Sequence, residues 1–385
     1  MSRIIKGFFI LIVTLPILSG CWDEIEPQRM YYVNGVGVDF KDNQYEIYLQ
    51  LINFKDIAKS EIPYVPEAPA EIGYAIGETL EEAIYELYRS IDQEVFWGHM
   101  NFLIFTEEAL KHEEVISVFD TFLRFRETRY QMNVHLTQDS LKEILLTTPI
   151  LNKSLIDSKL SHPLNARKLE VFTEPVNLKN LVIGLNEPSH EVSLPLVSIV
   201  KNWDTTKEHP SKETTIKGIG ILSKDGFKGV IIGDNARGIN WMQNKKNRGD
   251  LTFKLDNNKS LTVDMEEKYF DVKPVIKGNQ VQFDVDIKVD VILNGFKKKA
   301  TENAIRKGVI KKVKEEIKAT YEAGLKLNVD IYRLSEHLYR NNVKVWKALE
   351  NNGKIPLNEE SIRIINVEID KIKSGRKTFS ETINK

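Results

Sequence analysis

The segments YYVNGVGVDF (residues 31–40) and YEIYLQLIN (residues 45–53) begin the folded part of this chain. Both are rich in β-branched and aromatic residues, and apolar and polar positions largely alternate, which is typical of β-strands. The polar residues 41–44 between them predict the loop of a hairpin. The first half of the chain is therefore expected to be built on a sheet that starts with these two strands.

Helix and strand patterns alternate after this hairpin. The spacing from Thr79 to Glu82 is a capping box that predicts an amphipathic helix. Residues 102–105 predict a short strand, and Thr106 is expected to start a helix that resumes over residues 115–125. Residues 130–137 predict another strand.

Three further features complete this half. Residues 55–70 contain three prolines and predict an irregular segment. Asp139 is expected to cap a short helix that ends at residue 146. Residues 147–190 have scattered prolines and a looser pattern, and the whole order predicts one α+β domain that closes before residue 200.

The second half is expected to begin after a polar linker at residues 201–209. Residues 216–222 and 227–232 flank a Ser-Lys-Asp-Gly turn and predict a hairpin. Asp234 or Asn235 is then expected to cap a short helix that runs through Trp241.

More strands and a long helix follow. The expected strands cover residues 251–255, 261–269, 280–293 and 362–369. Residues 301–325 predict the longest helix, because apolar residues recur every four positions: Ile305, Val309, Val313, Ile317 and Tyr321. Asp330 is expected to cap the next helix, and residues 371–385 predict a frayed polar tail.

These patterns predict a multi-domain α+β protein with mixed or antiparallel sheets flanked by helices. The expected division is a signal peptide at 1–20, an α+β domain at 21–200, a β-rich domain at 201–275 and an α+β domain with long helices at 276–385. With 42% hydrophobic and 28% charged residues, the chain can bury ordinary globular cores.

The amino terminus predicts a lipoprotein signal peptide. Arg3 and Lys6 precede an apolar stretch at residues 8–18 that is too short to span a bilayer. Leu18-Ser19-Gly20-Cys21 then has the form of a lipobox, in which the cysteine is diacylated and becomes the mature amino terminus. The alternatives are an uncleaved anchor helix and a cleaved signal with an incidental cysteine.

Cys21 is the one cysteine of the chain, so the sequence allows no internal disulfide and no CxxC site. The formal net charge is −1, and it becomes −3 when the two basic residues of the signal are removed. This near-neutral balance gives no electrostatic support for nucleic-acid binding. The expected location is the outer face of a membrane, with lipid as the anchor.

The usual catalytic motifs are not present in the sequence. It has no GxSxG elbow and no P-loop. Gly35 with Gly37, and Gly218 with Gly220, lack the third glycine of a dinucleotide site. The seven histidines have no zinc-binding spacing, and His112-Glu113-Glu114 lacks the second histidine of HExxH. We therefore expect no catalytic residues, no metal and no cofactor.

Some weaker candidates have both a functional and a structural interpretation. Asp284, Asp286 and Asp290 share one strand face and could bind a cation, but a solvated polar face is favoured. Asp256-Asn257-Asn258 resembles the start of a calcium loop but lacks its later glycine and glutamate, which favours a turn.

The other candidates are surface features. Phe96-Trp97 could form an aromatic platform, but core packing is favoured. The arginines within residues 124–129 could bind an anion, but a solvated helix end is favoured. The helix at 301–325 could lie on a membrane, but packing on a core is favoured.

Several short motifs together resemble the Ger(x)C lipoproteins, the C subunits of endospore germinant receptors. They are Gly20-Cys21-Trp22-Asp23, Val33 to Asp39, Gly98 to Ile104, Phe122 to Glu127, Gly218 to Gly220, Phe227 to Gly229, Gly238 to Trp241, Asn328 to Asp330, Tyr339 and Lys344 to Lys347. Two positions depart from the family pattern: Glu127 replaces an aspartate, and no Phe-Gly follows Asp330. These departures leave a close subfamily assignment open.

The resemblance implies a lipoprotein on the outer surface of the spore inner membrane. Such a subunit assembles with A-type and B-type integral-membrane subunits, and the complex responds to nutrients. The family's fold implies three α+β domains, and the family is not known for catalysis. Small-molecule recognition is implied for a membrane subunit, so the ligand-binding residues are unknown here, and Cys21 is the functional residue carried over.

Two other functional classes remain as alternatives. An extracytoplasmic solute-binding lipoprotein of a transporter would share the lipobox and the size. The second half, however, lacks the repeated strand–helix alternation of a hinged two-lobe binder. An anchored hydrolase would depend on scattered carboxylates alone.

Overall fold

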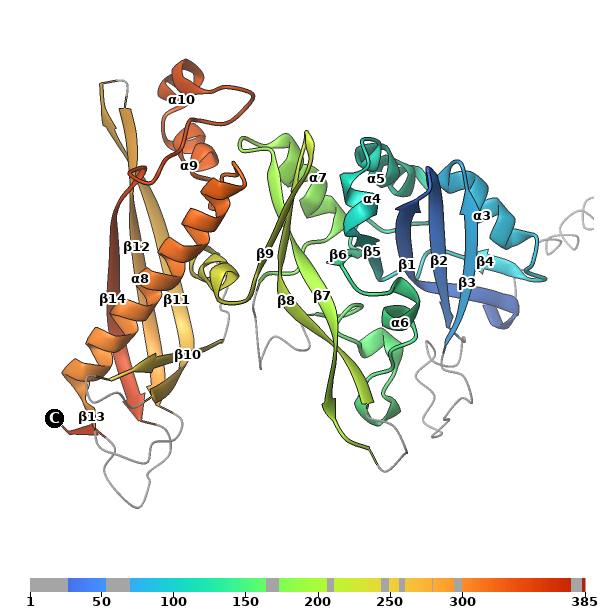
Figure 1. Cartoon of the computed structure of the whole chain (residues 1–385), viewed down its shortest axis with the longest axis horizontal. Helices are drawn as coiled ribbons and strands as arrows, with labels where there is room; N and C mark the ends of the chain where they lie inside the picture. Colours follow the sequence, from blue (N-terminus) through green and yellow to red (C-terminus); the bar gives the residue numbers. More distant parts are fainter. Residues whose placement is uncertain are drawn as a thin grey trace, which may run out of the picture.

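The computed structural model describes residues 27–52, 70–163, 173–205, 211–243, 249–255, 260–278, 280–293, 300–374 and 383–384. Within these residues the strands form a nine-stranded sheet, a four-stranded sheet and a two-stranded pair (Figure 1). Mixed sheets flanked by helices confirm the predicted α+β class. The predicted signal peptide, Cys21, the segment 53–69, Asp256-Asn257-Asn258 and residues 375–382 lie outside the described residues.

The nine-stranded sheet has the order β3-β2-β1-β5-β6-β7-β8-β9, with β4 also paired to β1. The pairs β1–β5, β5–β6 and β6–β7 in the middle of this order are parallel, and the strand pairs at both ends of the sheet are antiparallel. The strands are β1 (Met30–Lys41), β2 (Gln44–Ile52), β3 (Ala70–Gly77), β4 (Glu94–Phe96), β5 (Phe102–Thr106), β6 (Asn133–Thr137), β7 (Glu191–Trp203), β8 (Ser211–Ser223) and β9 (Gly226–Ile232).

Helices cover both faces of this sheet. The main core cluster joins the inner strands to α3 (Leu80–Tyr88), α4 (Glu107–Lys111), α5 (Val115–Arg124) and α7 (Leu178–Asn186). A second cluster contains α6 (Leu141–Leu145) together with Phe102 and Ile104 of β5. The strand is therefore buried on both faces, which fits its continuously apolar sequence. Short 3-10 turns occur at Pro27–Arg29, Ile150–Asn152 and Leu155–Asp157.

The second sheet has the order β10-β11-β12-β14, and α8 lies along one of its faces (Figure 1). The elements of this half are β10 (Gly249–Lys254), β11 (Ser260–Lys277), β12 (Gln280–Leu293), β13 (Ala300–Thr301), α8 (Glu302–Lys326), α9 (Leu334–Asn341), α10 (Val343–Leu349), β14 (Ile362–Ser374) and β15 (Ile383–Asn384). All five apolar residues predicted for the inner stripe of the long helix are buried. None of the described helices is long and apolar enough to cross a membrane.

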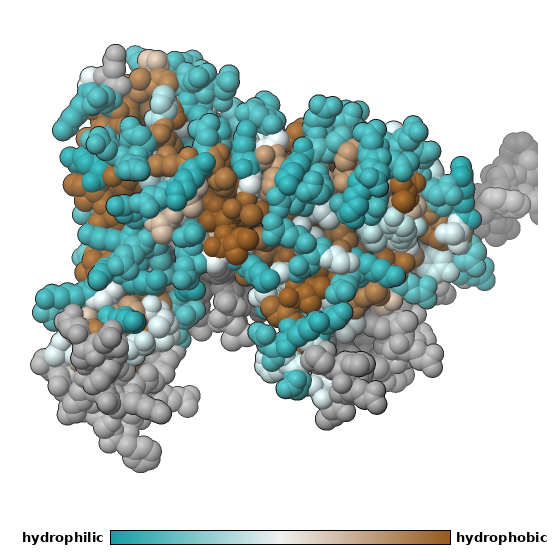
Figure 2. Space-filling view, viewed as in Figure 1, coloured by the Kyte–Doolittle hydropathy of each residue, from teal (hydrophilic) through white to brown (hydrophobic). Residues whose placement is uncertain are grey.

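The two sheets share a hydrophobic core. Ile219 and Ile231 of the first sheet belong to the same buried cluster as Trp241 of the 3-10 helix η5 (Gly233–Met242) and Val313 of α8. On the face shown in Figure 2, hydrophobic residues gather between the upper part of α8 and β9. The first sheet and the second half are therefore joined here by one buried core.

Several predictions from the sequence are confirmed. The loop of the first hairpin consists of Asp42 and Asn43, both with positive φ, as the favoured two-residue turn requires. The amide of Glu82 donates to Thr79 Oγ1 at 3.1 Å, as a capping box predicts. Thr106 caps α4 in the same manner.

The cap predictions at Asp139, Asp234 and Asn235 are wrong. Ser140 caps α6, because the Asp139 carboxylate is instead bonded to Ser198 Oγ at 2.6 Å and to the Ile199 amide at 2.7 Å on β7. η5 is a 3-10 helix without a side-chain cap.

The expected element bounds also need correction. Residues 130–132 precede β6, and β14 continues through Ser374. β3, β4, β7 and α7 were not predicted from the sequence. The predicted linker at 201–209 overlaps β7, which pairs with β8, and the predicted boundary at 275/276 falls inside the β11–β12 hairpin.

Candidate functional site

The residue singled out for lipidation, Cys21, lies outside the described residues, so it has no described geometry. The structure places the motif residues that follow Met30. Some of them lie at three positions: a buried amide network under the first sheet, the contact between η5 and α8, and the junction between the two halves.

The amide network begins with Asn34 in β1. Its side chain accepts from Asn101 Nδ2 at 2.8 Å and donates to Gln50 Oε1 at 2.6 Å. Ser161 Oγ also donates to Asn34, and Gln50 donates to the carbonyl of Leu145. The asparagines of two motifs thus hold the 155–161 segment and α6 against the sheet, which satisfies polar groups that would be costly to bury alone.

The contact between η5 and α8 depends on the motif from Gly238 to Trp241. A Cβ at Gly238 would lie 2.3 Å from the carbonyl oxygen of Glu316, so the close approach requires glycine. Trp241 Nε1 donates to the Glu316 carboxylate at 2.8 Å, and Arg237 Nε donates to it at 3.1 Å. Glu316 is buried but has these two donors, which is how a buried charge is usually held.

Asp330 organises the junction between the two halves. Its carboxylate accepts from the amides of Leu334 and Ser335 at 2.7 Å each, and from Ser189 Oγ at 2.7 Å. The predicted cap at Asp330 needs correction, because Arg333 is the N-cap residue of α9, with φ 54°. Asp330 lies three positions before Arg333, accepts from the first two amides of that helix, and joins them to the loop before β7.

Glu191, the first residue of β7, supports the same junction from the other side. Its carboxylate accepts from the Asp330 amide at 2.6 Å and forms an ion pair with Lys354. Burial raises the pKa of Glu191, and the neighbouring Lys354 ammonium opposes that rise.

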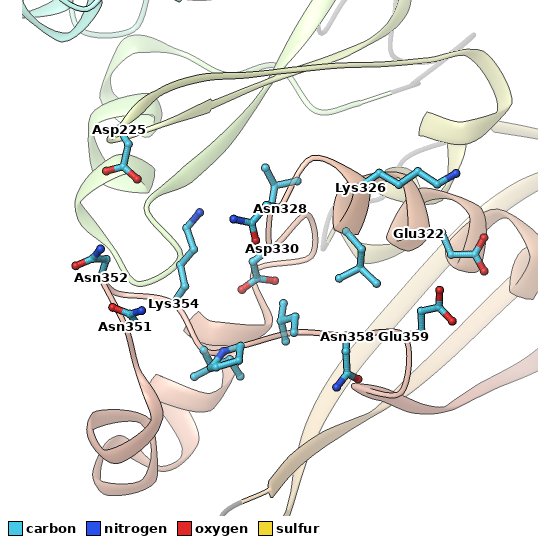
Figure 3. Close-up of a pocket in the computed structure, with 15 residues that line it drawn as sticks. Asp225, Glu322, Lys326, Asn328, Asp330, Asn351, Asn352, Lys354, Asn358 and Glu359 are labelled. Atoms are coloured by element: carbon cyan, nitrogen blue, oxygen red, sulfur yellow. The ribbon is translucent and has the colours of Figure 1, made fainter.

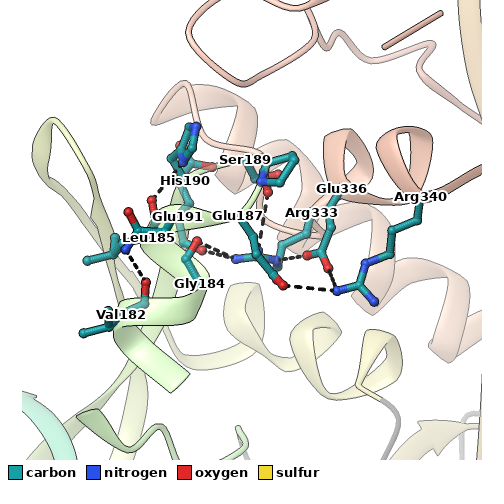
Figure 4. Close-up of polar contacts among 12 residues, drawn as sticks. Val182, Gly184, Leu185, Glu187, Ser189, His190, Glu191, Arg333, Glu336 and Arg340 are labelled. Atoms are coloured by element: carbon teal, nitrogen blue, oxygen red, sulfur yellow. Dashed lines mark hydrogen bonds and ion pairs between the residues drawn. The ribbon is translucent and has the colours of Figure 1, made fainter. Parts of the chain in front are cut away.

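Arg333 adds contacts across the junction (Figure 4). Its guanidinium donates to the carbonyls of Glu191 and Gly184, the latter at 3.3 Å, and it lies 3.5 Å from the Glu187 carboxylate. Ser189, Glu191 and Arg333 were missed by the sequence analysis. Their hydrogen-bond partners are about 140 residues away along the chain, and a local sequence pattern does not predict such distant pairs.

A cleft of about 930 Å³ opens beside this junction (Figure 3). It is lined by the end of α8, by residues 328–330 and by residues 351–359, with Asp225 contributed by the turn between β8 and β9. Its lining contains carboxamides, both signs of charge and an apolar part. The motif from Asn328 to Asp330 lies in its wall, but nothing in the sequence indicated a cleft there.

All three strand-face carboxylates are engaged in ion pairs, and Asp290 is buried whereas Asp284 and Asp286 are partly exposed. Asp284 pairs with Arg363, Asp286 lies 2.6 Å from Lys273 Nζ, and Asp290 lies 4.0 Å from Lys371 Nζ. Among the described residues, no group of three or more His, Cys, Asp or Glu side chains could hold a metal ion. The favoured interpretation as a solvated polar face agrees with the structure for Asp284 and Asp286, but it is wrong for Asp290, whose side chain is buried.

The remaining candidates also have structural roles. Trp97 is buried, stacks on Phe125 with ring centroids 5.4 Å apart, and donates to Tyr88 Oη at 2.7 Å. Arg124 pairs with Asp120 one turn earlier. His112 stacks on Phe40 at 3.8 Å.

Two buried titratable groups lie elsewhere. Burial lowers the pKa of His135 in β6 to about 4, and its Nε2 lies 3.1 Å from the Leu160 carbonyl. Burial lowers the pKa of Lys268 in β11 to about 8, and its ammonium donates to the Asn240 carbonyl.

Comparison with known proteins gives matches over both halves. A family model described as the spore germination protein N-terminal domain matches residues 23–199, and one described as spore germination B3/GerAC like, C-terminal, matches residues 217–370. The chain belongs to the GerAC-like family of spore germination proteins. The resemblance noted in the sequence is thereby confirmed.

Two curated relatives come from Bacillus subtilis (strain 168). Spore germination protein KC is 22% identical, and the alignment covers 89% of each chain. Spore germination protein B3 is 21% identical, with 88% of this chain and 91% of the relative covered. The crystal structure of the GerBC protein aligns with a TM-score of 0.53 and 15% identity over 88% of this chain and 96% of that one, which shows a shared fold.

The GerAC family is one of germinant receptor C subunits and is not known as an enzyme family. The motif residues described above make contacts within the fold of a germination protein. They fix the 155–161 segment, the η5–α8 contact and the junction of the two halves.

Proposed function

We propose that this chain is a membrane-anchored lipoprotein subunit of a spore nutrient germinant receptor. In this proposal it assembles with A-type and B-type integral-membrane subunits and is required for the germination response. It acts by binding these partners and catalyses no reaction. The observation that carries the proposal is the family match over both halves, combined with the lipobox that precedes it.

The anchor follows from the chemistry of the lipobox. Two acyl chains on Cys21 would contribute about 0.8 kcal/mol for each buried CH₂ group, and dual acylation is sufficient for stable anchoring. The folded part would then lie on the outer face of the cell membrane or spore inner membrane. We also propose that residues 1–20 are removed and that the mature chain begins at Cys21.

The two halves supply the division into domains that we propose. The expected boundaries at 200 and 275 cross paired strands. We therefore propose one unit around the nine-stranded sheet, up to Ile232, and a second unit from Gly233 onward that contains the four-stranded sheet. This division keeps every hairpin within one unit.

Replacing Cys21 tests the anchor. We expect Cys21→Ala to lose lipidation and to leave the membrane fraction, because the thiol is the acylation site. Ser19→Ala, which keeps a small residue in the lipobox, is the matched control and should fractionate with the natural chain. Circular dichroism should show both variants folded, and normal membrane retention of Cys21→Ala would contradict the proposal.

A further inference from the structure

The cleft at the junction has walls from three segments of the second half and one turn of the first. In Figure 3, Asp225 and Asn352 lie on one side, Glu322 and Glu359 on the other, and Asn328 lies between them. This arrangement exposes groups of the two halves to one space. A molecule bound there would contact both.

The polar groups of the cleft include carboxamides that are not used by the fold. Asn328, Asn351 and Asn352 are exposed, and their side chains have no hydrogen-bond partner among the described residues. Each carboxamide offers a donor and an acceptor on one planar group. The peptide backbone carries the same pair of groups, so these side chains can bond an extended chain in both directions.

The apolar part of the cleft lies next to these amides. Leu325, Val329, Ile355, Pro356 and Leu357 contribute to its lining. Val329 and Ile355 are buried, whereas Leu325 and Leu357 are partly exposed. An apolar side chain of a bound segment can therefore be shielded from water while its backbone meets the carboxamides, as in other peptide-binding grooves.

The charges of the cleft are of both signs. Lys326 is positively charged, whereas Glu322 and Glu359 are negatively charged. The lining therefore does not have the uniformly positive potential that would attract a polyanion. Small-molecule pockets are usually enclosed by mostly apolar walls, with few polar groups. A wide, amide-rich cleft with mixed charge fits a peptide segment better than it fits a nucleic acid or a small metabolite.

The walls are held in place before any partner binds. Asn328, Asn352 and Gly353 all have positive φ, at 54°, 51° and 78°. Glycine and asparagine adopt such backbone more readily than other residues, and contacts with the surroundings fix it here. Here the Ser189 amide donates to the Gly353 carbonyl at 3.0 Å, and the Asp330 network holds the neighbouring loop. A preorganised wall reduces the ordering cost of binding.

We propose that this cleft binds an extended peptide segment from an extracytoplasmic part of an integral-membrane receptor subunit. This inference rests on the proposed function, because the partner is the integral-membrane subunit named there. The inference adds the surface of this chain that contacts the partner. The cleft belongs to the second half and the junction, away from the lipid anchor in the sequence.

The test uses thiol labelling in membranes. Cys21 is blocked by its acyl chains, so Asn351→Cys or Glu359→Cys each introduces one reactive thiol at the cleft. Tyr269→Cys and Tyr85→Cys are matched controls, because these side chains are 57% and 64% exposed on other surfaces. Maleimide labelling rates are measured with and without the co-expressed integral-membrane subunits, and co-purification of the subunits is checked in parallel.

We expect the partners to slow labelling at positions 351 and 359 by about tenfold or more, because a docked segment excludes solvent. The two control positions should label at unchanged rates. Equal slowing at all four positions, or full reactivity of the cleft thiols in a complex that co-purifies, would overturn this inference and leave the proposed function standing. Failure to co-purify would count against the proposed function itself.

If the cleft bound a small molecule instead of a peptide, the labelling experiment would give a different result. In that case saturating glycine or glucose would slow labelling of the cleft thiols in the chain without its partners. Such protection would overturn the peptide inference in favour of a metabolite site.

Discussion

At the scale of single residues, carboxylates that bond to distant backbone define the contacts between elements. Asp139 was predicted as a helix cap, yet it bonds to Ser198 and Ile199 on β7. Sequence shows which residues can accept a bond from a nearby amide. It does not show that a residue 60 positions away competes for the same carboxylate.

Asp330 shows the same limit and gives the first prediction. Asp330→Ala would leave the amides of Leu334 and Ser335 and the Ser189 hydroxyl without their acceptor. We expect a loss of about 2–4 kcal/mol in the free energy of unfolding, because buried donors would lose their bonds. Denaturant unfolding measures it.

The control for that variant is Asp120→Ala, which removes an exposed carboxylate paired with Arg124. Such pairs contribute little, so the loss should stay within about 0.5 kcal/mol. An Asp330→Ala variant as stable as Asp120→Ala would contradict the role assigned to the junction.

His135 gives a prediction on pH. Burial lowers its pKa to about 4 from the ordinary value of 6.5, so between these values the unfolded chain binds a proton that the folded chain does not. Stability should therefore fall as the pH decreases from about 6.5 toward about 4, and be unaffected by this group above that range. His135→Gln should remove this part of the slope in unfolding experiments.

The slope is the readout, because the substitution can also change stability by a constant amount at all pH values. An unchanged slope in His135→Gln would contradict this prediction, because it would show that folding does not lower the pKa of His135.

At the scale of elements, sequence predicted best where one pattern extends over many residues. The helix α8 matches its prediction to within a residue at each end, and its stripe is buried. β3 was missed, because it follows a proline-rich segment and is half exposed with two glycines. α7 was missed because the scattered prolines were taken as irregularity, although Pro175 and Pro188 flank the helix.

The helix α8 gives the next prediction. Val313→Ala removes two methyl groups from the core shared by the two sheets, where Val313 is fully buried. We expect a loss of about 1–3 kcal/mol in the free energy of unfolding from lost burial and the cavity left behind. Lys314→Ala, on the exposed side of the same helix, should change stability by about 0.5 kcal/mol or less.

The free energies of unfolding of the two variants are compared by thermal or denaturant unfolding. Equal stability of the two variants would contradict the packing of this helix against the shared core.

At the scale of the whole molecule, alternation and turn residues identified the β1–β2 and β8–β9 hairpins, but not the pairing of strands that are far apart in the chain. Lys201 and Asn202 begin a mainly polar run that resembled a linker, yet residues 201–203 continue β7 beside β8. The candidate cleft was also unpredictable, because its walls meet only when the loop at residues 351–359 folds back on the end of α8. The lipobox, by contrast, is a local chemical signal that sequence can show directly.

In the proposed function, an acylated cysteine holds this germination protein on a membrane beside its partners. Mass spectrometry of the amino-terminal peptide from membranes of the natural host tests this anchoring. We expect a chain that begins at Cys21 and carries a diacylglyceryl group on the thiol. An unmodified Cys21, or a mature chain that begins at another residue, would contradict it.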